Sequence, residues 1–520
     1  MALKKCAIWL ILACMMLSLM SCGEKPASSS NNSTVSAVAS DEMTESGMGS
    51  EENGSTNEST VSTGSSVTTN NSNQSTNSKP NTNTSTNTSS KKTAEGNGEI
   101  SKNVLVKNGT KKMEEGLNFS GKTFTMACGI APTNQVKRHI AAFQKKYNCT
   151  IKTDVLDFNQ YTQQVVSKIA SGGTYDLLQL EGSRYPTMVL ANTCEPIEDI
   201  ITTADWLNKS KLDEGGFSEE LSMAFAWDNH LYGVLGIRGM YAPSPNLVWY
   251  NKKILKQAGT DDPRELYESG KWTFDALRQI GLDVKKSVKI PLGGIFMLYG
   301  NIVPANGGWY VKYNENGTKP VSNLTDSRIA NAYKFMQQLT VGNNAVIEVS
   351  ASYDCKAFLQ GKSAMWVGAP YHLSANNEIA KKVEDSNAFG KSLTNLGVTP
   401  MPMGPDNKEK AYGVGWLYSF AAGKGTSDKR VAVAWAKFAT TYKDPIKDEY
   451  TWSAADQKMI DSLTSGNMIY RNYAFADGSN SIYELVRKME YEISVGKDIS
   501  QEVTTYNVMF KNCINVSLKG

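Results

Sequence analysis

The chain is poor in the side chains on which most metallohydrolases and thiol enzymes depend. Only three histidines occur among its 520 residues, His139, His230 and His372, and they lie far apart in the sequence. No HExxH, CxxC or GxSxG string is present. Zinc hydrolases, dithiol redox enzymes and serine hydrolases therefore lose their usual sequence support. Carboxylate-based catalysis stays open, because composition alone does not exclude it.

An excess of one charge is also missing. The 54 basic and 51 acidic residues give a formal net charge of +3, which offers no global attraction to nucleic acid or to an anionic membrane. The segment Gly423-Lys424-Gly425-Thr426-Ser427 lacks the first glycine of a phosphate loop, and Gly413-Val414-Gly415 lacks the third glycine of a dinucleotide-binding fingerprint. We therefore expect no nucleic-acid partner, no cofactor and no metal site.

Cysteines are sparse after the first 22 residues. The five that remain are irregularly spaced: Cys128, Cys149, Cys194, Cys355 and Cys513. Because their number is odd, at least one is unpaired within a monomer, and a disulfide scaffold is not expected. A Cys128–Cys149 bridge is the first pairing to test, and five packed thiols are the alternative.

The N-terminus has the pattern of an export signal. Lys4 and Lys5 precede an apolar run from Cys6 to Met20 that is too short for a comfortable spanning helix. The run ends in Leu19-Met20-Ser21-Cys22-Gly23, which resembles the bacterial lipobox. We expect residues 1–21 to be a signal peptide and Cys22 to carry acyl chains that hold the protein at the extracellular face of the cell membrane. The alternative is an ordinary secretory signal with an incidental cysteine.

A polar tether is predicted next. From Pro26 to about Gly98, Ser, Thr and Asn dominate and aromatic residues are absent. Such a composition cannot bury enough apolar surface to offset the entropy of ordering, so we predict a disordered linker over residues 22–116. For the 70 or so most biased residues, random-coil scaling gives an end-to-end distance of roughly 40–50 Å.

The rest of the chain reads as α/β. Strands are expected at 122–128, 149–155 and 176–180, and helical spacing of apolar residues separates them. This order indicates parallel βαβ units, in which loops at the carboxyl ends of the strands form a ligand-binding edge. A second set follows, with strands at 247–250, 363–367 and 396–400 and helices at 274–280, 328–339 and around 431–442. Four tryptophans fall inside these apolar patterns and are expected in the core: Trp249, Trp272, Trp366 and Trp435.

Short segments along this part of the chain occur in a familiar order. They are Gly121-Lys122-Thr123-Phe124-Thr125, Ala142-Phe143-Gln144-Lys145-Lys146-Tyr147, Lys168-Ile169-Ala170-Ser171-Gly172, Tyr175-Asp176-Leu177-Leu178, Tyr232-Gly233-Val234, Trp249-Tyr250-Asn251-Lys252, Lys271-Trp272-Thr273-Phe274-Asp275, Asn306-Gly307-Gly308, Gly361-Lys362-Ser363-Ala364-Met365 and Tyr412-Gly413-Val414-Gly415-Trp416. Their collinear order behind a lipobox resembles the extracellular solute-binding lipoproteins of bacterial ABC importers, in the maltose- and oligosaccharide-binding branch (family 1).

The resemblance implies a two-lobed clamshell of the periplasmic-binding-protein type (type II). By analogy, lobe 1 comprises 117–238 and 418–460, and lobe 2 comprises 239–417 and 461–520. Lobes of this kind close around a ligand like a hinge, and the closed monomer is recognised by permease subunits. The function that follows is capture of a carbohydrate, a small oligosaccharide by preference, without catalysis.

The resemblance also implies ligand-binding residues. Tyr371 falls where sugar-binding relatives have the Trp of Asn-Gly-Pro-Trp, and Trp416 lies at a crossover between lobes. Arg184 matches the Arg of an Asp-Arg pair, and Glu181 could supply the missing carboxylate. Further candidates near the expected cleft are Asp157, Tyr299 and Trp309. For each of the aromatic residues, core packing is the alternative, and a solvated surface pair is the alternative for Glu181 and Arg184.

Two other classes of function stay open. A surface-tethered glycan hydrolase or lyase needs two carboxylates about 5–10 Å apart, and Glu181 and Asp157 are the available pair. An adhesin or sensor could use the same fold without transport, because a fold does not determine a function.

Overall fold

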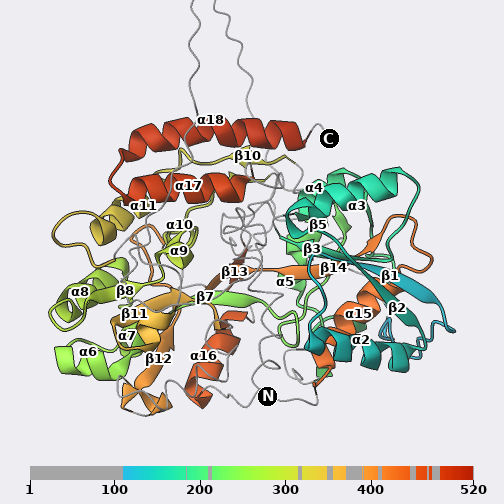
Figure 1. Ribbon diagram of the computed structural model, residues 1–520, viewed down its shortest axis with the longest axis horizontal. Coiled ribbons are helices and arrows are strands. Elements are labelled where there is room, and N and C mark those ends of the chain that lie inside the picture. The colour runs from blue at the N-terminus through green and yellow to red at the C-terminus, as the bar shows by residue number, and fades with distance from the viewer. Residues whose placement is uncertain are drawn as a thin grey trace, which may run out of the picture. The chain divides into compact units, whose positions relative to one another are not determined.

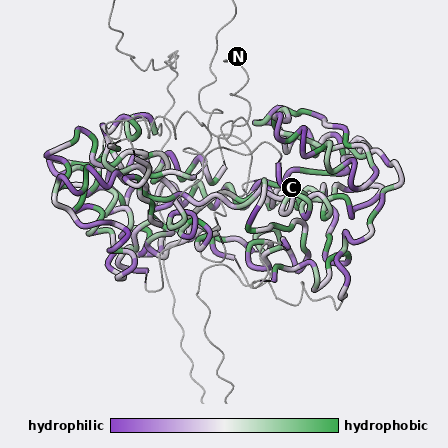
Figure 2. The backbone as a smooth tube through the Cα atoms, turned by 90° about the horizontal axis from the view of Figure 1, so that it is seen from below, coloured by the Kyte–Doolittle hydropathy of each residue, from purple (hydrophilic) through white to green (hydrophobic). Residues whose placement is uncertain are grey.

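The computed structural model describes residues 109–182, 184–208, 214–313, 319–347, 355–370, 389–390, 392–407, 413–444, 453–464, 468–470 and 481–518. The predicted signal peptide, Cys22, linker residues 22–108 and Tyr371 lie outside these ranges. Within them, no helix is long and apolar enough to cross a membrane. Figure 2 shows the corresponding pattern, in which hydrophobic and hydrophilic stretches alternate along the backbone.

The first sheet has five strands in the order β2-β1-β3-β14-β4. Its strands are β1 (Thr123–Cys128), β2 (Thr150–Val155), β3 (Leu177–Glu181), β4 (Cys194–Glu195) and β14 (Tyr418–Gly423). β1 runs parallel to β2 and β3, and helices α2 (Asn134–Tyr147) and α3 (Tyr161–Ala170) make the crossovers (Figure 1). The predicted βαβ units are therefore confirmed. β14 pairs antiparallel with β3 and β4, so a distant segment completes this sheet.

Local sequence explains why α2 forms where it does. The Thr133 side chain accepts a hydrogen bond from the Val136 N–H at the start of the helix, and Asn148 ends it with a left-handed φ of 49°. Lys145 and Lys146 in the last turn complement the helix dipole. The buried face of α2 packs against α15 (Arg430–Thr441), which also covers β14.

The second sheet has six strands and is built around β7 (Ser244–Asn251). The remaining strands are β8 (Ile290–Gly293), β11 (Ser363–Gly368), β12 (Leu396–Thr399), β13 (Gly413–Trp416) and β15 (Met468–Tyr470), in the order β15-β13-β7-β11-β8 with β12 also on β7. β11, β12 and β13 all pair antiparallel with β7, whereas β8 is parallel to β11 and β15 is parallel to β13. β7 is accordingly buried along nearly its whole length.

Most helices around the second sheet come between its strands or after them in the sequence. They are α6 (Lys252–Ala258), α7 (Pro263–Glu268), α8 (Phe274–Val284), α9 (Ile295–Leu298), α10 (Ile302–Ala305), α11 (Ser327–Thr340), α12 (Lys356–Leu359), α16 (Ala454–Thr464), α17 (Ile482–Ser494) and α18 (Ile499–Ser517). α11, α17 and α18 pack on one another, as Figure 1 shows. α16 packs against β7 and β12, so the predicted lobe boundary at residue 460 falls inside a helix of the second set.

Shorter elements connect these parts. The helices are α4 (Tyr185–Leu190), α5 (Glu219–Ser222), η3 (Phe158–Gln160), η4 (Thr203–Asp205), η6 (Met223–Phe225) and η8 (Leu393–Asn395). Two small hairpins are β5 (Ala226–Trp227) with β6 (His230–Leu231), and β9 (Val311–Lys312) with β10 (Val321–Ser322).

The tryptophans expected in the core are all buried. Trp249, Trp272, Trp366 and Trp435 are each at most 1% exposed. The indole N–H of Trp249 donates to the Gly368 carbonyl at 2.9 Å, and that of Trp272 donates to the Pro400 carbonyl at 2.9 Å. The indole N–H groups of these two buried tryptophans therefore have hydrogen-bond acceptors.

The segment 109–116, predicted as linker, is instead held against the first sheet's loops. The Met113 N–H donates to Asp205 Oδ1 at 2.9 Å, the Thr202 hydroxyl donates to the Lys111 carbonyl at 3.0 Å, and that of Thr203 donates to the Gly109 carbonyl at 2.7 Å. Met113 also packs on the apolar core beside α2. Composition alone could not predict these contacts, because backbone hydrogen bonds to distant side chains leave no mark in local composition.

The proposed Cys128–Cys149 bridge is absent, and none of the five cysteines in the described ranges forms a disulfide. Cys128 is in register with Val155, whereas Cys149 precedes Thr150, which is in register with Thr123. The two thiols thus belong to opposite ends of the β1–β2 pair, beyond the reach of a disulfide. Burial raises the pKa of Cys128 to about 12, so its thiol stays protonated and unreactive.

One histidine lies inside the first core without a polar contact. His139 is fully buried on α2, and the rings of Trp435, Phe438 and Tyr442 meet its ring edgewise at centroid distances of 4.6, 4.8 and 5.0 Å. Neither ring nitrogen has a hydrogen-bond partner within the described residues. Burial lowers the pKa of His139 to about 3, although the nearby Asp444 carboxylate acts in the opposite direction.

This burial predicts a pH-dependent stability. The unfolded chain takes up the imidazole proton near pH 6.5 and the folded chain does so only near pH 3, so stability is full above pH 6.5 and falls as the pH decreases. His139 alone should remove about 2 kcal/mol from the free energy of unfolding between pH 7.5 and pH 5. Urea unfolding at both pH values should show that His139→Leu loses about that much less than the wild type. Identical pH dependence in His139→Leu and in the wild type would contradict the prediction.

Candidate functional site

Two of the predicted site residues meet at the carboxyl edge of the first sheet. Glu181 ends β3, and Arg184 immediately precedes α4. Arg184 Nε lies 3.5 Å from Glu181 Oε2, and both side chains are about one-tenth exposed, at 11% and 9%. The structure thus joins them as a nearly buried ion pair, rather than as the solvated surface pair that was the alternative.

An aromatic ring that sequence reasoning missed completes this edge. The guanidinium carbon of Arg184 lies 4.2 Å from the ring centroid of Phe158 and 5.4 Å from that of Tyr161, within cation–π range. Arg184 also donates to the Phe158 carbonyl at 2.7 Å. Phe158 is half-buried and directly follows Asp157 in the loop between β2 and α3, at the carboxyl end of β2, and this position could have revealed it.

Asp157, another predicted site residue, caps a turn at the same edge. Its Oδ1 accepts hydrogen bonds from the backbone N–H groups of Asn159 at 2.9 Å and Gln160 at 3.1 Å, which caps η3. The exposed carboxylate therefore holds the turn that presents Phe158, while Glu181 faces Arg184. The two carboxylates considered as a catalytic pair have separate partners.

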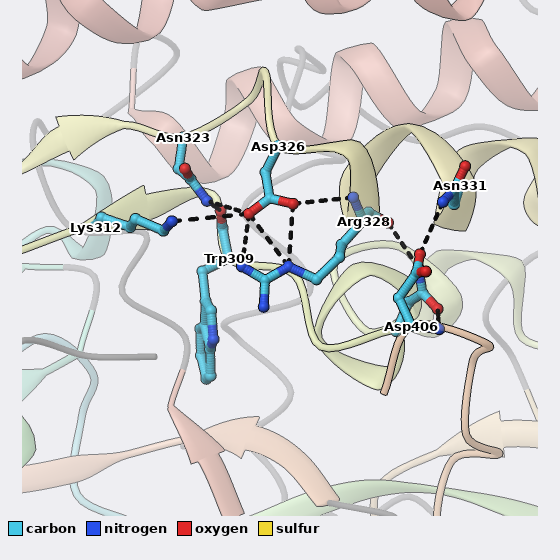
Figure 3. A network of polar contacts seen from close by, with 8 residues as sticks. Trp309, Lys312, Asn323, Asp326, Arg328, Asn331 and Asp406 are labelled. Atoms are coloured by element: carbon cyan, nitrogen blue, oxygen red, sulfur yellow. Dashed lines mark hydrogen bonds and ion pairs between the residues drawn. The ribbon is translucent and has the colours of Figure 1, made fainter. Parts of the chain in front are cut away.

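A network of hydrogen bonds around Asn306 supports the segment that carries Trp309, and we call this network the base of Trp309. The buried Asn306 donates from Nδ2 to the Arg328 carbonyl at 2.7 Å and to Asp406 Oδ2 at 2.9 Å, and its Oδ1 accepts from the Asp406 N–H at 3.0 Å. Gly307, with φ of 76°, then turns the chain. The Trp309 carbonyl accepts from Asn323 Nδ2 at 2.9 Å. Figure 3 shows the half-buried indole extending away from this polar network.

The charges around Trp309 neutralise one another. Asp326 caps α11, and its two carboxylate oxygens accept hydrogen bonds from Arg328 Nε at 3.0 Å and the Arg328 terminal nitrogen at 2.7 Å (Figure 3). Lys312 adds a weaker contact at 3.8 Å. The Arg328 guanidinium lowers the pKa of Asp326 to about 2, so the pair is ionised at neutral pH and its charges are matched.

The described contacts do not bring the other predicted residues, Tyr299, Trp416 and Tyr371, to the Glu181–Arg184 edge or to the base of Trp309. Tyr299 is buried, its hydroxyl lies 2.7 Å from Ser494 Oγ, and the next residue's N–H donates to Glu490 Oε2 at 2.6 Å. It thus packs the end of α9 against α17. Trp416, in β13, is in register with Ser244 of β7. The Trp416 side chain and the whole of Tyr371 lie outside the described part of the chain.

No group of three or more His, Cys, Asp or Glu side chains in the described ranges is arranged to hold a metal ion. The edge at Glu181 and Arg184 and the base of Trp309 consist of aromatic rings, amides and paired charges. Such groups bind by stacking and hydrogen bonding.

Comparison with known proteins gives the class. Residues 131–444, more than half of the chain, match the bacterial extracellular solute-binding protein family. The chain belongs to this family. No curated protein matches it.

Solved structures give the fold. The chain is similar to the GacH receptor of Streptomyces glaucescens, with 16% identity, a TM-score of 0.52, and 77% of this chain and 99% of that one covered. The solute-binding protein of Staphylococcus aureus crystallised with maltose has 16% identity, a TM-score of 0.55 and 76% and 98% coverage. MalE of Xanthomonas citri has 15% identity, a TM-score of 0.58 and 76% and 98% coverage. The predicted two-lobed α/β clamshell is confirmed.

The support of Trp309 can be tested through stability. Asn306→Ala removes a buried amide that makes three hydrogen bonds and leaves their partners unsatisfied, so we expect it to reduce the free energy of unfolding by about 2–3 kcal/mol. The control Asn331→Ala removes one half-buried hydrogen bond to Asp406 Oδ2, at 2.9 Å, and should cost less than about 1 kcal/mol. Chemical denaturation measures both. Equal losses would show that Asn306 does not organise this base.

Proposed function

We propose that this protein captures a carbohydrate, preferably a small oligosaccharide, between its two lobes and delivers it intact to an ABC transporter permease. Two observations support the proposal: a half-buried indole, Trp309, on a hydrogen-bonded base in the second set of elements, and an aromatic and ionic edge at Phe158, Glu181 and Arg184 in the first. Sugars present apolar C–H faces and hydroxyl edges, which aromatic rings and hydrogen-bonding groups complement. Membership of the solute-binding family supports a transport role.

The charge arrangement favours a neutral ligand. Arg184 is paired with Glu181, and Arg328 with Asp326, so each guanidinium already has an anionic neighbour. A phosphate or carboxylate ligand would have to compete with these carboxylates, which makes anion capture unfavourable. A hydroxyl-rich ligand needs no uncompensated charge.

Ligands of similar structures agree with this choice. The GacH receptor was solved with acarbose, the Staphylococcus aureus protein with maltose, and a Listeria monocytogenes substrate-binding protein with cycloalternan, at 14% identity to this chain and a TM-score of 0.52. These are carbohydrates of more than one ring, and a Thermotoga lettingae solute-binding protein, at 18% identity to this chain and a TM-score of 0.52, was solved with the single-ring sugar tagatose. We extend the class, and not any one compound, to this protein.

The proposal includes the rest of the chain. The first and second sheets form the cores of the two closing lobes, Tyr371 and Trp416 add aromatic surface to the cleft, and a lipid on Cys22 anchors the monomer at the extracellular face of the cell membrane. Because several acyl chains on one cysteine give a durable anchor, the permease and the binding protein stay on one surface.

Ligand binding can be tested by thermal unfolding with maltose, acarbose, cycloalternan and tagatose. We expect at least one sugar to raise the melting temperature of the wild type and to be recovered unchanged after incubation. Trp309→Ala should reduce the affinity at least tenfold, about 1.4 kcal/mol, because the stacking face is lost. Trp309→Phe, which keeps an aromatic face, should restore part of it. Sugar cleavage would instead support the hydrolase class, and no shift with any sugar would contradict the proposal.

The anchor predicts where the protein is found. In cells that make the full chain, Cys22→Ala should remove lipid attachment and release the protein from the membrane fraction, as fractionation and mass spectrometry of the mature N-terminus would show. Cys128→Ala, which changes a buried thiol of β1, is the control and should stay with the membrane. Membrane retention of the Cys22→Ala protein would contradict lipid anchoring at this residue.

A further inference from the structure

One buried carboxylate holds both ends of the segment that carries Trp309. Glu490 lies on α17 and is fully buried. Its Oε2 accepts a hydrogen bond from the Gly300 N–H at 2.6 Å, and its Oε1 accepts one from the Tyr310 hydroxyl at 2.6 Å. Each carboxylate oxygen therefore contacts a different end of the segment 300–310, and Trp309 is the residue next to Tyr310.

This segment has little regular structure of its own. Its helix α10 is four residues long, and the glycines on either side of it, Gly300 and Gly307, have left-handed φ values of 68° and 76°. So short a helix is not stable by itself, because the cost of its first turn is not repaid by later ones. The segment 300–310 therefore takes its conformation mainly from contacts with other elements.

Helix α17 provides a firm support for those contacts. It is 13 residues long and packs against α11 and α18. One turn after Glu490, Ser494 Oγ lies 2.7 Å from the hydroxyl of Tyr299, the residue just before Gly300. Figure 1 shows α17 running beside α10, in agreement with these hydrogen bonds.

A carboxylate is a costly group to use for packing alone. Taking it out of water costs free energy that only good hydrogen bonds recover, and an apolar side chain would fill the same space without that cost. Hydrogen bonds to a carboxylate are short and strong, so they restrict the positions of their donors. The two bonds of Glu490 therefore suit a residue that sets geometry.

We propose that Glu490 is a positioning residue for ligand binding, which holds the Trp309 indole in a fixed orientation through Gly300 and Tyr310. The inference rests on the proposed function, in which Trp309 stacks on a sugar. A stacking ring binds more tightly when its orientation is set in advance, because no free energy is then spent on ordering it. Affinity thus depends on a residue of α17 that lies 180 positions from Tyr310 in the sequence.

The first test asks whether Glu490 acts through Trp309. Glu490→Ala should weaken binding about fivefold in calorimetric titration with whichever of maltose, acarbose, cycloalternan and tagatose binds the wild type. In a Trp309→Ala background the same substitution should change the affinity less than about twofold, because no indole is left to position. Glu490→Gln keeps an acceptor for the Gly300 N–H and should restore part of the affinity. Equal losses in both backgrounds overturn the inference.

A second measurement needs no ligand. In fluorine NMR of protein labelled with fluorotryptophan, the Trp309 signal is the one missing from Trp309→Phe. Tyr310→Phe and Glu490→Ala should both shift or broaden this signal, because the indole then samples more orientations. The matched control is Tyr250→Phe, which removes a hydrogen bond of the same 2.6 Å length, to Asp262, from a fully buried phenol of β7. It should leave the Trp309 signal unchanged.

The fluorine signal decides the role of Glu490 in each case. An unchanged Trp309 signal in Glu490→Ala overturns the inference, and if that variant does not fold, an unchanged signal in Tyr310→Phe does so. An equal change in Tyr250→Phe would indicate general loosening of the protein and would also overturn it. Failure of every sugar to bind the wild type would contradict the proposed function, and the fluorine signal would still show whether Glu490 positions the indole.

Discussion

The candidate site depends on the antiparallel pairing of β14 with β3. This pairing places Tyr418 in register with Glu181, and just beyond it the Gly182 N–H donates to the Leu417 carbonyl at 3.1 Å. The chain reaches β14 directly from β13 of the second sheet, so one continuous segment connects the two sheets at the carboxyl edge that carries Glu181 and Arg184. Strand pairing fixes these side chains far more strongly than a free loop would.

The arginine side chains of the candidate site are neutralised by neighbouring carboxylates. The guanidinium of Arg184 is held by a carboxylate, a carbonyl and a ring, and that of Arg328 by both oxygens of Asp326. Paired in this way, they orient backbone and aromatic groups instead of attracting ions. Asp157 likewise serves a turn. The groups that remain at these places are aromatic rings and hydrogen-bonding groups, which agree with the uncharged ligand that we propose.

Local sequence patterns predicted where the strands lie, but not which distant residues contact one another. The expected strands 122–128, 149–155 and 176–180 correspond to β1, β2 and β3 within one residue at each end, because apolar alternation and turn residues are local signals. The same patterns could not show that 109–116 binds Thr202, Thr203 and Asp205, or that Asp157 caps η3 beside Phe158. Such contacts join side chains to backbone groups whose proximity arises only after folding.

By itself, the sequence determined the class of fold, the family, the buried tryptophans and the presence of Glu181 and Arg184 at a strand end, since periodicity and residue type carry that information. Only the tertiary structure decided that Glu181 and Arg184 pair beside Phe158 and that Trp309 extends from a network of Asn306, Asn323 and Asp406. The physical reason is that the decisive contacts join residues far apart in the sequence, from 26 positions for Arg184 and Phe158 to 100 positions for Asn306 and Asp406, and local propensity does not specify them.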